Sequence, residues 1–196
     1  LDVATGTARL ARTLFQQSHF RGRLIGVDLS RKMLQQAVLA TAAWSDRITF
    51  IRQDAGQLPF PDETFDAVAC LEALEFMPDP DRVLREMVRV LRPGGFLLTT
   101  NRIGKDARWL PGRTCTPEAF EAKLRALSLE MVQTRLWQED YDLISAVKTG
   151  VRGPVGMRRL EEILRCPRCG QPLQRRDAAF HCANDHTVPI TAEGLL

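Results

Sequence analysis

Apolar positions divide most of the chain into two kinds of segment. Short segments that are almost continuously apolar alternate with longer ones in which apolar residues recur every three or four positions. The first kind is typical of strands in a parallel sheet covered on both faces, and the second of helices with one buried face. The predicted strands are residues 1–5, 24–28, 48–52, 66–71 and 96–100.

The end of this alternation has a different character. Residues 129–137 and 141–148 are both strand-like, and only the polar residues 138–140 separate them. So short a connection is typical of an antiparallel hairpin. We therefore predict a doubly wound, Rossmann-like α/β fold. Its sheet has seven mostly parallel strands, ends in this hairpin, and carries a ligand site at the carboxyl ends of the strands.

The composition changes near residue 150. Three glycines and a proline crowd residues 149–159, which predicts a linker over 150–159. A short cysteine-rich segment follows. We expect two domains, one over 1–149 and a small one over 160–196.

Charge and cysteine content narrow the class of protein. The net charge is +3, from 27 basic and 24 acidic residues, which is too balanced to indicate a nucleic-acid partner. No apolar run is long enough to span a membrane, and no signal peptide is recognised. Five cysteines, two of them in a C-x-x-C pair, favour metal binding over disulfides and hence a cytoplasmic location. The first residue is Leu1 rather than methionine, which indicates a fragment of a longer protein.

Three residues at the ends of the first three predicted strands form a candidate ligand site. Gly6 lets a ligand approach the backbone at a strand-to-helix turn. Asp28 ends the next strand 22 residues later, where an acid accepts hydrogen bonds from ribose hydroxyls. Asp54, after the third strand, can accept one from the amino group of adenine. Each could singly be a turn residue or a helix cap, but their order predicts an adenosine pocket.

Residues 1–148 resemble the class I S-adenosylmethionine-dependent methyltransferases, above all the branch with the menaquinone and ubiquinone biosynthesis enzymes. The most specific matches are LPFPDETFDAV and RVLRPGG. The resemblance implies that the first turn wraps the methionine part of the cofactor, that the acid after the second strand holds the ribose, and that Leu71 lies beside the sulfonium. The implied cofactor-binding residues are Asp2, Ala4, Gly6, Asp28, Leu29, Asp54, Ala55 and Leu71.

The chain departs from the family pattern in two respects. Ala4 and Ala8 stand where glycines are usual, and the methyl group of Ala8 is expected to weaken binding at the cofactor's carboxylate end. The helices that normally precede the first strand and close the substrate pocket are missing. An NAD(P)-dependent oxidoreductase is a weaker alternative, because the dinucleotide fingerprint lacks its third glycine and Ser145 stands where a lysine should follow Tyr141.

Methyl transfer needs mainly orientation and a dry cavity, and it needs a base only when the acceptor loses a proton. The candidate bases are Glu72, Glu75 and Asn101. Both glutamates are interpreted more simply as surface charges on a short helix, so no catalytic residue is assigned.

The cysteine-rich tail predicts a metal site. Cys166 and Cys169 form a knuckle, Cys182 follows after twelve intervening residues, and His186 after three more. Three sulfurs and one imidazole complete a tetrahedral zinc site, and the metal would supply much of the folding energy of so small a unit. His181 is a second candidate ligand, although its side chain is expected to point away from that of Cys182.

The tail resembles two zinc ribbons. One begins a 23S rRNA guanine methyltransferase and has the same spacing, and the other is a small activator protein that partners several methyltransferases and shares ILRCPRCGQPL. The likeness of residues 1–148 to the quinone branch implies an S-adenosylmethionine-dependent methyltransferase that acts on a small-molecule acceptor. Two alternatives stay open. One is an RNA methyltransferase whose ribbon docks RNA, and the other is a non-catalytic partner or scaffold whose ribbon binds protein.

Overall fold

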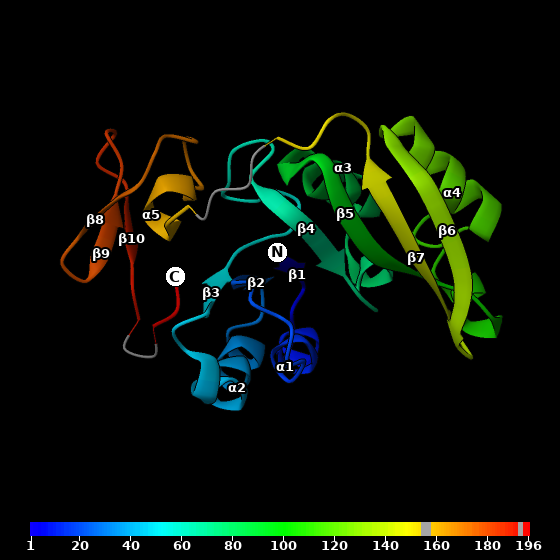
Figure 1. Ribbon diagram of the computed structural model, residues 1–196, viewed down its shortest axis with the longest axis horizontal. Coiled ribbons are helices and arrows are strands. Elements are labelled where there is room, and N and C mark those ends of the chain that lie inside the picture. The colour runs from blue at the N-terminus through cyan, green and yellow to red at the C-terminus, as the bar shows by residue number, and fades with distance from the viewer. Residues whose placement is uncertain (154–157, 192–193) are drawn as a thin grey trace. The chain divides into compact units, whose positions relative to one another are not determined.

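The computed structural model describes residues 1–153, 158–191 and 194–196 (Figure 1). Its main sheet has seven strands in the order β3-β2-β1-β4-β5-β7-β6, and a small sheet has the order β10-β9-β8. The strands of the main sheet are β1 (Asp2–Val3), β2 (Leu24–Asp28), β3 (Ile48–Arg52), β4 (Phe65–Cys70), β5 (Leu91–Arg102), β6 (Leu129–Gln138) and β7 (Tyr141–Lys148). Those of the small sheet are β8 (Gln174–Arg176), β9 (Ala179–His181) and β10 (Thr187–Pro189).

Strand directions confirm the predicted fold class. The pairs β1–β2, β2–β3 and β4–β5 are parallel, whereas β7 pairs antiparallel with both β5 and β6. The small sheet is antiparallel throughout. The α-helices are α1 (Arg9–Phe15), α2 (Arg31–Ala40), α3 (Pro80–Val90), α4 (Pro117–Ala126) and α5 (Leu160–Ile163).

The chain forms two compact units, Leu1–Pro61 with Val155–Leu196, and Asp62–Pro154. The predicted division at residues 149 and 160 differs from these units and stays a prediction. Residues 154–157 of the predicted linker lie outside the described part of the chain. Among the helices of the described residues, none is long and apolar enough to cross a membrane.

In the first unit, α1 and α2 pack on β2 and β3 through one apolar cluster. Ser30 caps α2 by accepting a hydrogen bond from the Met33 backbone N–H, which sets where this helix begins. The chain also returns to this core at its end, because Leu195 lies in the same cluster with only 2% of its surface exposed. The buried members of the cluster are Ala8, Ala11, Phe15, Leu24, Leu34, Ala37, Ile48, Phe50 and Leu195.

In the second unit, two capped helices accompany β4, β5, β7 and β6. Asp79 accepts from the Arg82 N–H at the start of α3, and Thr116 accepts from the Ala119 N–H at the start of α4. A proline occupies the first turn of each helix, where its missing N–H costs nothing. α3 buries Val83, Leu84, Met87, Val88 and Val90.

Candidate functional site

The turn after β1 contains three residues with a left-handed backbone, and only one of them is glycine. Ala4, Gly6 and Ala8 have φ values of 55°, 55° and 61°. Only glycine adopts this conformation without cost, so the two alanines accept backbone strain. A Cβ built at Gly6 would meet no atom within 4 Å, so space is open beside the turn. Ala8, in contrast, is fully buried in the apolar cluster, so its methyl group packs in the core.

Asp28 joins this turn to the end of β2. Its Oδ2 accepts a hydrogen bond from the Gly6 N–H at 2.9 Å, and its Oδ1 accepts one from the Ser30 N–H at 2.8 Å. Each carboxylate oxygen can accept a further bond, and the side chain is only partly buried. The arrangement therefore offers two fixed, charged acceptors beside a glycine turn.

The end of β3 lies next to the end of β2. Arg52 pairs in register with Asp28, and the Gln53 N–H donates to the Asp28 backbone oxygen at 3.2 Å. Asp54 follows directly, with an exposed side chain whose Oδ1 accepts from the Gly56 N–H at 2.7 Å. The predicted residues Gly6, Asp28 and Asp54 thus come from adjoining strand ends of one unit.

The other predicted cofactor residues differ in exposure. Ala55 is buried, whereas Leu29 has 61% of its surface exposed beside Asp28. Leu71 follows β4 in the second unit, and its assignment beside a sulfonium stays a prediction.

Asp2 is a buried carboxylate at the start of β1. Only 4% of its surface is exposed, and its Oδ2 accepts a hydrogen bond from the Thr5 hydroxyl at 2.6 Å. Burial raises the pKa of Asp2 from 3.8 to about 6, with a further contribution from the charge of Asp28. At neutral pH this side chain is therefore an anion held at the turn against the cost of desolvation.

We expect Asp2→Asn to stabilise the fold at pH 8 but not at pH 4. Because the folded-state pKa is raised, the folded protein binds the proton more tightly, and the stability this gives is lost as the pH rises through 6. Asparagine does not ionise, so it avoids this loss. The loss in free energy of unfolding is up to about 3 kcal/mol, at 1.36 kcal/mol per pKa unit. Urea unfolding of both proteins at the two pH values measures it, and an equal difference at both would contradict the assignment.

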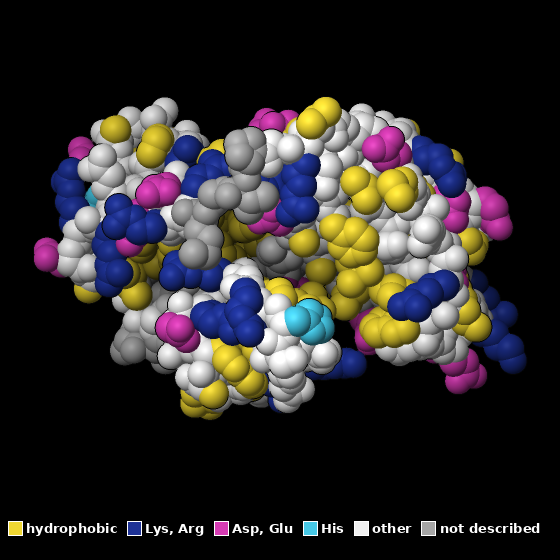
Figure 2. Space-filling model, viewed as in Figure 1, with side chains coloured by type: hydrophobic (Ala, Val, Ile, Leu, Met, Phe, Trp, Pro, Cys, Tyr) yellow, Lys and Arg dark blue, Asp and Glu magenta, His cyan; other side chains and the backbone are white. Residues whose placement is uncertain are grey.

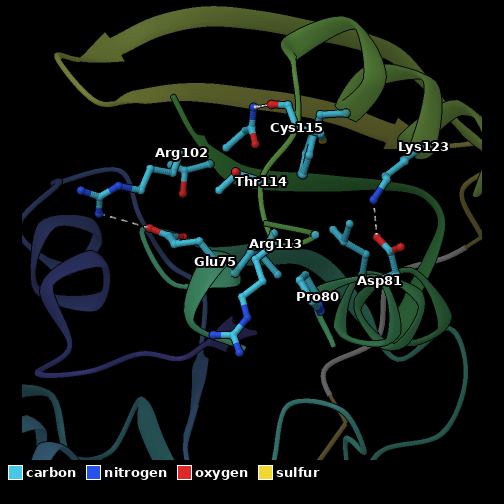
Figure 3. Close-up of a pocket in the computed structure, with 14 residues that line it drawn as sticks. Glu75, Pro80, Asp81, Arg102, Arg113, Thr114, Cys115 and Lys123 are labelled. Atoms are coloured by element: carbon cyan, nitrogen blue, oxygen red, sulfur yellow. Dashed lines mark hydrogen bonds and ion pairs between the residues drawn. The ribbon is translucent and has the colours of Figure 1, made fainter. Parts of the chain in front are cut away.

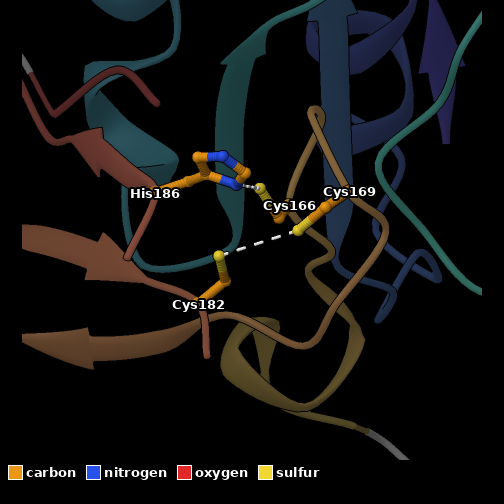
Figure 4. A group of neighbouring side chains, drawn as sticks. All are labelled: Cys166, Cys169, Cys182 and His186. Atoms are coloured by element: carbon orange, nitrogen blue, oxygen red, sulfur yellow. Dashed lines mark hydrogen bonds between the residues drawn. The ribbon is translucent and has the colours of Figure 1, made fainter. Parts of the chain in front are cut away.

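The four predicted metal ligands come together in the tail. The ligand atoms of Cys166, Cys169, Cys182 and His186 all lie within 4.8 Å of one another (Figure 4). The Sγ atoms of Cys169 and Cys182 are 3.7 Å apart, and Cys166 Sγ is 3.5 Å from His186 Nδ1. Zn–S bonds of about 2.3 Å and Zn–N bonds of about 2.0 Å at tetrahedral angles require about 3.8 Å and about 3.5 Å. The donor set therefore fits zinc in chemistry, and these two separations match tetrahedral spacing.

His181 stands outside this cluster. Its Nδ1 lies 3.1 Å from the Thr187 hydroxyl, a partner directly across the β9–β10 pair. The side chain of His181 thus contacts a residue of the neighbouring strand and not the metal cluster.

A pocket in the second unit contains charged and apolar side chains (Figure 3). Its cavity is small, about 20 Å³, and is partly open to solvent. Leu74, Leu84 and Phe120 supply apolar lining, and Asp81 and Lys123 form an ion pair at 2.7 Å on one side. Asn101, a candidate base from the sequence, donates through Nδ2 to the Cys115 backbone oxygen, so this amide holds the pocket wall.

Glu75 is the buried acid of this pocket. The sequence favoured a surface charge, but only 2% of Glu75 is exposed, so that interpretation was wrong. Tyr141 donates its hydroxyl proton to Glu75 Oε1, and Arg102 Nη1 lies 3.9 Å from the same oxygen. Glu75 Oε2 is buried with no hydrogen-bond partner among the residues the structure describes. The other glutamate, Glu72, is half-buried and accepts a hydrogen bond from Gln138.

Tyr141 is a site residue that sequence reasoning missed. Burial and the hydrogen bond to Glu75 raise the pKa of Tyr141 to about 12, so the phenol stays protonated and keeps donating. Its only signal in the sequence is that it is the sole tyrosine and begins the last predicted strand.

We expect Tyr141→Phe to destabilise the fold by about 1–3 kcal/mol, because it removes a donor from a buried carboxylate. Urea unfolding measures the change. The matched control is Tyr141→Phe combined with Glu75→Leu, which should cost less than the sum of the single variants since the unpaired charge is gone. Additive losses would show that the two side chains do not depend on each other.

Comparison with known proteins decides the family. A family model described as a methyltransferase domain matches residues 1–99. This chain belongs to that methyltransferase family. The match covers the glycine turn, Asp28, Asp54 and the segment through β4 to most of β5, which includes Glu75.

Several relatives of this chain carry names from quinone biosynthesis. The ubiquinone/menaquinone biosynthesis C-methyltransferase UbiE of Hahella chejuensis is 40% identical over 100 residues, which cover 50% of this chain and 40% of that protein. A demethylmenaquinone methyltransferase of Listeria monocytogenes is 32% identical over 164 residues, or 83% of this chain and 66% of that protein. The chain thus spans less than two thirds of the length of these relatives.

Solved structures support the fold of the methyltransferase domain. A S-adenosylmethionine-dependent methyltransferase from Aquifex aeolicus superposes with a TM-score of 0.62 at 17% identity, covering 74% of this chain and 79% of that one. At this identity the likeness establishes the fold alone.

Proposed function

We propose that this protein is an S-adenosylmethionine-dependent methyltransferase that acts on a small molecule, with a quinol ring as the first acceptor to test. The observation that carries the proposal is Asp28, which is fixed by the Gly6 and Ser30 N–H groups and still has acceptor capacity on both oxygens. A pair of neighbouring ribose hydroxyls presents two donors to such a carboxylate. The quinone-biosynthesis names of the relatives support the acceptor class.

The residues at the ends of β1, β2 and β3 would bind the cofactor in sequence order. The open side of the turn at Gly6 suits the methionine part, and the buried anion Asp2 suits its ammonium group. Asp28 with Leu29 would hold the ribose, and Asp54 with Ala55 would face adenine. The cofactor, when bound, brings the methyl group on a sulfonium that is also the leaving group, so the protein has only to orient, exclude water and manage a proton.

The pocket of the second unit supplies the buried acid that C-methylation of a quinol would call on. C-methylation of a quinol replaces a ring C–H by C–CH₃, so one proton must leave. Glu75 Oε2 would accept it, because Tyr141 already occupies Oε1.

The surface of the tail gives little support to the two alternatives, an RNA-docking ribbon and a protein-binding ribbon. Basic and acidic side chains are mixed on the visible face rather than gathered into one basic field (Figure 2). Two of the arginines near the tail are paired with acids, Arg152 with Asp66 and Arg159 with Glu162. A structural zinc in the Cys₃His cluster is the simpler proposal for the ribbon.

Calorimetric titration with S-adenosylmethionine tests the cofactor, and methyl transfer from labelled cofactor to demethylmenaquinol tests the acceptor. We expect heat of binding with the wild-type protein and a labelled quinol product. Glu75→Gln should keep cofactor affinity while slowing transfer by about 100-fold, the range of general base catalysis. No heat on titration would refute the proposal, whereas heat without a labelled product would refute only the quinol.

A further inference from the structure

The knuckle of the metal cluster is hydrogen-bonded to the loop that begins with Asp54. The Arg165 N–H, one residue before Cys166, donates to the Pro59 backbone oxygen at 2.8 Å. The side-chain Nε2 of Gln57 donates to the backbone oxygen of Pro167, inside the knuckle, at 3.0 Å. Two contacts from opposite directions therefore join residues 57–59 to residues 165–167.

The same loop is rigid between these contacts and Asp54. The Gln57 N–H donates to the Asp54 backbone oxygen at 3.1 Å, and the Gly56 N–H donates to the Asp54 carboxylate at 2.7 Å. The loop is also anchored beneath, since Leu58 and Phe60 are 4% and 2% exposed. A displacement of Gln57 would therefore be transmitted to Asp54.

The knuckle is closed by its own backbone hydrogen bonds and carries two of the four metal ligands. Within it, the Gly170 N–H donates to the Cys166 oxygen and the Cys166 N–H donates to the Gln171 oxygen, both at 2.8 Å. This turn presents Cys166 and Cys169 toward His186 and Cys182. The three thiols of the cluster bind metal as thiolates. Without an ion, no metal bonds hold them together in this small volume.

We propose that metal in the Cys₃His cluster positions the Asp54 turn through Gln57, so that metal binding and cofactor binding strengthen each other. This coupling rests on the proposed function, because Asp54 matters to it only as part of a cofactor site. Linkage requires the effect to be reciprocal: the metal raises cofactor affinity, and the cofactor raises metal affinity by the same factor.

The test uses the zinc-loaded full chain, S-adenosylhomocysteine as the probe, and two readouts. Calorimetry gives the dissociation constant of the probe, and competition with a chromogenic chelator gives the zinc affinity with and without the probe. Gln57→Ala removes one of the two contacts, keeps the Arg165–Pro59 hydrogen bond, and removes neither a metal ligand nor Asp54. Gln36→Ala, an exposed glutamine on α2, is the matched control.

We expect Gln57→Ala to weaken probe binding three- to tenfold at unchanged zinc content, the value of one hydrogen bond. It should also reduce by the same factor the gain in zinc affinity that the probe causes, while Gln36→Ala behaves as wild type. Equal probe affinity in Gln57→Ala and wild type, with a zinc affinity that the probe leaves unchanged, would overturn the coupling and leave the proposed function standing. No binding to the wild-type protein would overturn both.

Discussion

Asp28→Asn is expected to weaken S-adenosylmethionine binding by about 100-fold or more. The substitution removes the charge that strengthens hydrogen bonds from the ribose, each worth about 1.5–3 kcal/mol when the acceptor is ionised. It also places an NH₂ group against the N–H of Gly6 or Ser30, both of which donate to the native carboxylate. The turn would then lose its anchor as well as its acceptor.

Calorimetry measures this effect, and thermal unfolding of the same sample separates lost affinity from lost folding. The control is Asp46→Asn, since Asp46 is exposed and has no side-chain hydrogen bond in the described part of the chain. A dissociation constant within twofold of wild type for Asp28→Asn would remove the ribose assignment and the main support for the proposed function.

Cys169→Ser is expected to lower the zinc content from about one ion per chain to less than a tenth. The native cluster offers four donors within 4.8 Å of one another, and structural zinc sites of this kind contribute about 10–16 kcal/mol to folding. Loss of one thiolate should therefore also unfold the small sheet of β8, β9 and β10. Metal analysis of the purified protein gives the content, and amide hydrogen exchange of residues 174–189 gives the unfolding.

Two variants serve as controls for this experiment. Cys115→Ser alters a half-buried cysteine of the second unit, and His181→Ala alters the histidine that contacts Thr187 instead of the cluster. Both should retain about one zinc. If His181→Ala released the metal while His186→Ala kept it, the ligand assignment would be wrong.

Local sequence patterns predicted much of the fold, because parallel strands and their helices have distinct periodicities. They located all seven main strands, although β5 begins at Leu91 rather than at residue 96, and β1 has two residues rather than five. The chain turns after Val3 because Ala4 already has a left-handed backbone. The metal ligands of the tail could also be predicted from the sequence, since all four lie within 21 residues.

Contacts distant in sequence were not predictable in this way. Glu75 resembles an ordinary surface acid, and its burial depends on Tyr141, which lies 66 residues later and reaches it only through the folded sheet. The link between Gln57 and Pro167 spans 110 residues and pairs a side chain with a backbone oxygen, which has no sequence signature. Such partners are fixed by topology rather than by local preference.

The final two residues have a consequence for handling the protein. The Arg52 N–H donates to the Leu196 oxygen, and the Leu196 N–H donates to the Phe50 oxygen, so they occupy the outer hydrogen-bonding groups of β3, the first strand in the sheet order. Bare strand edges recruit other chains and initiate aggregation. Deleting Leu195 and Leu196 would uncover this edge together with an apolar socket, so the shortened protein should precipitate at concentrations where the intact chain stays dispersed.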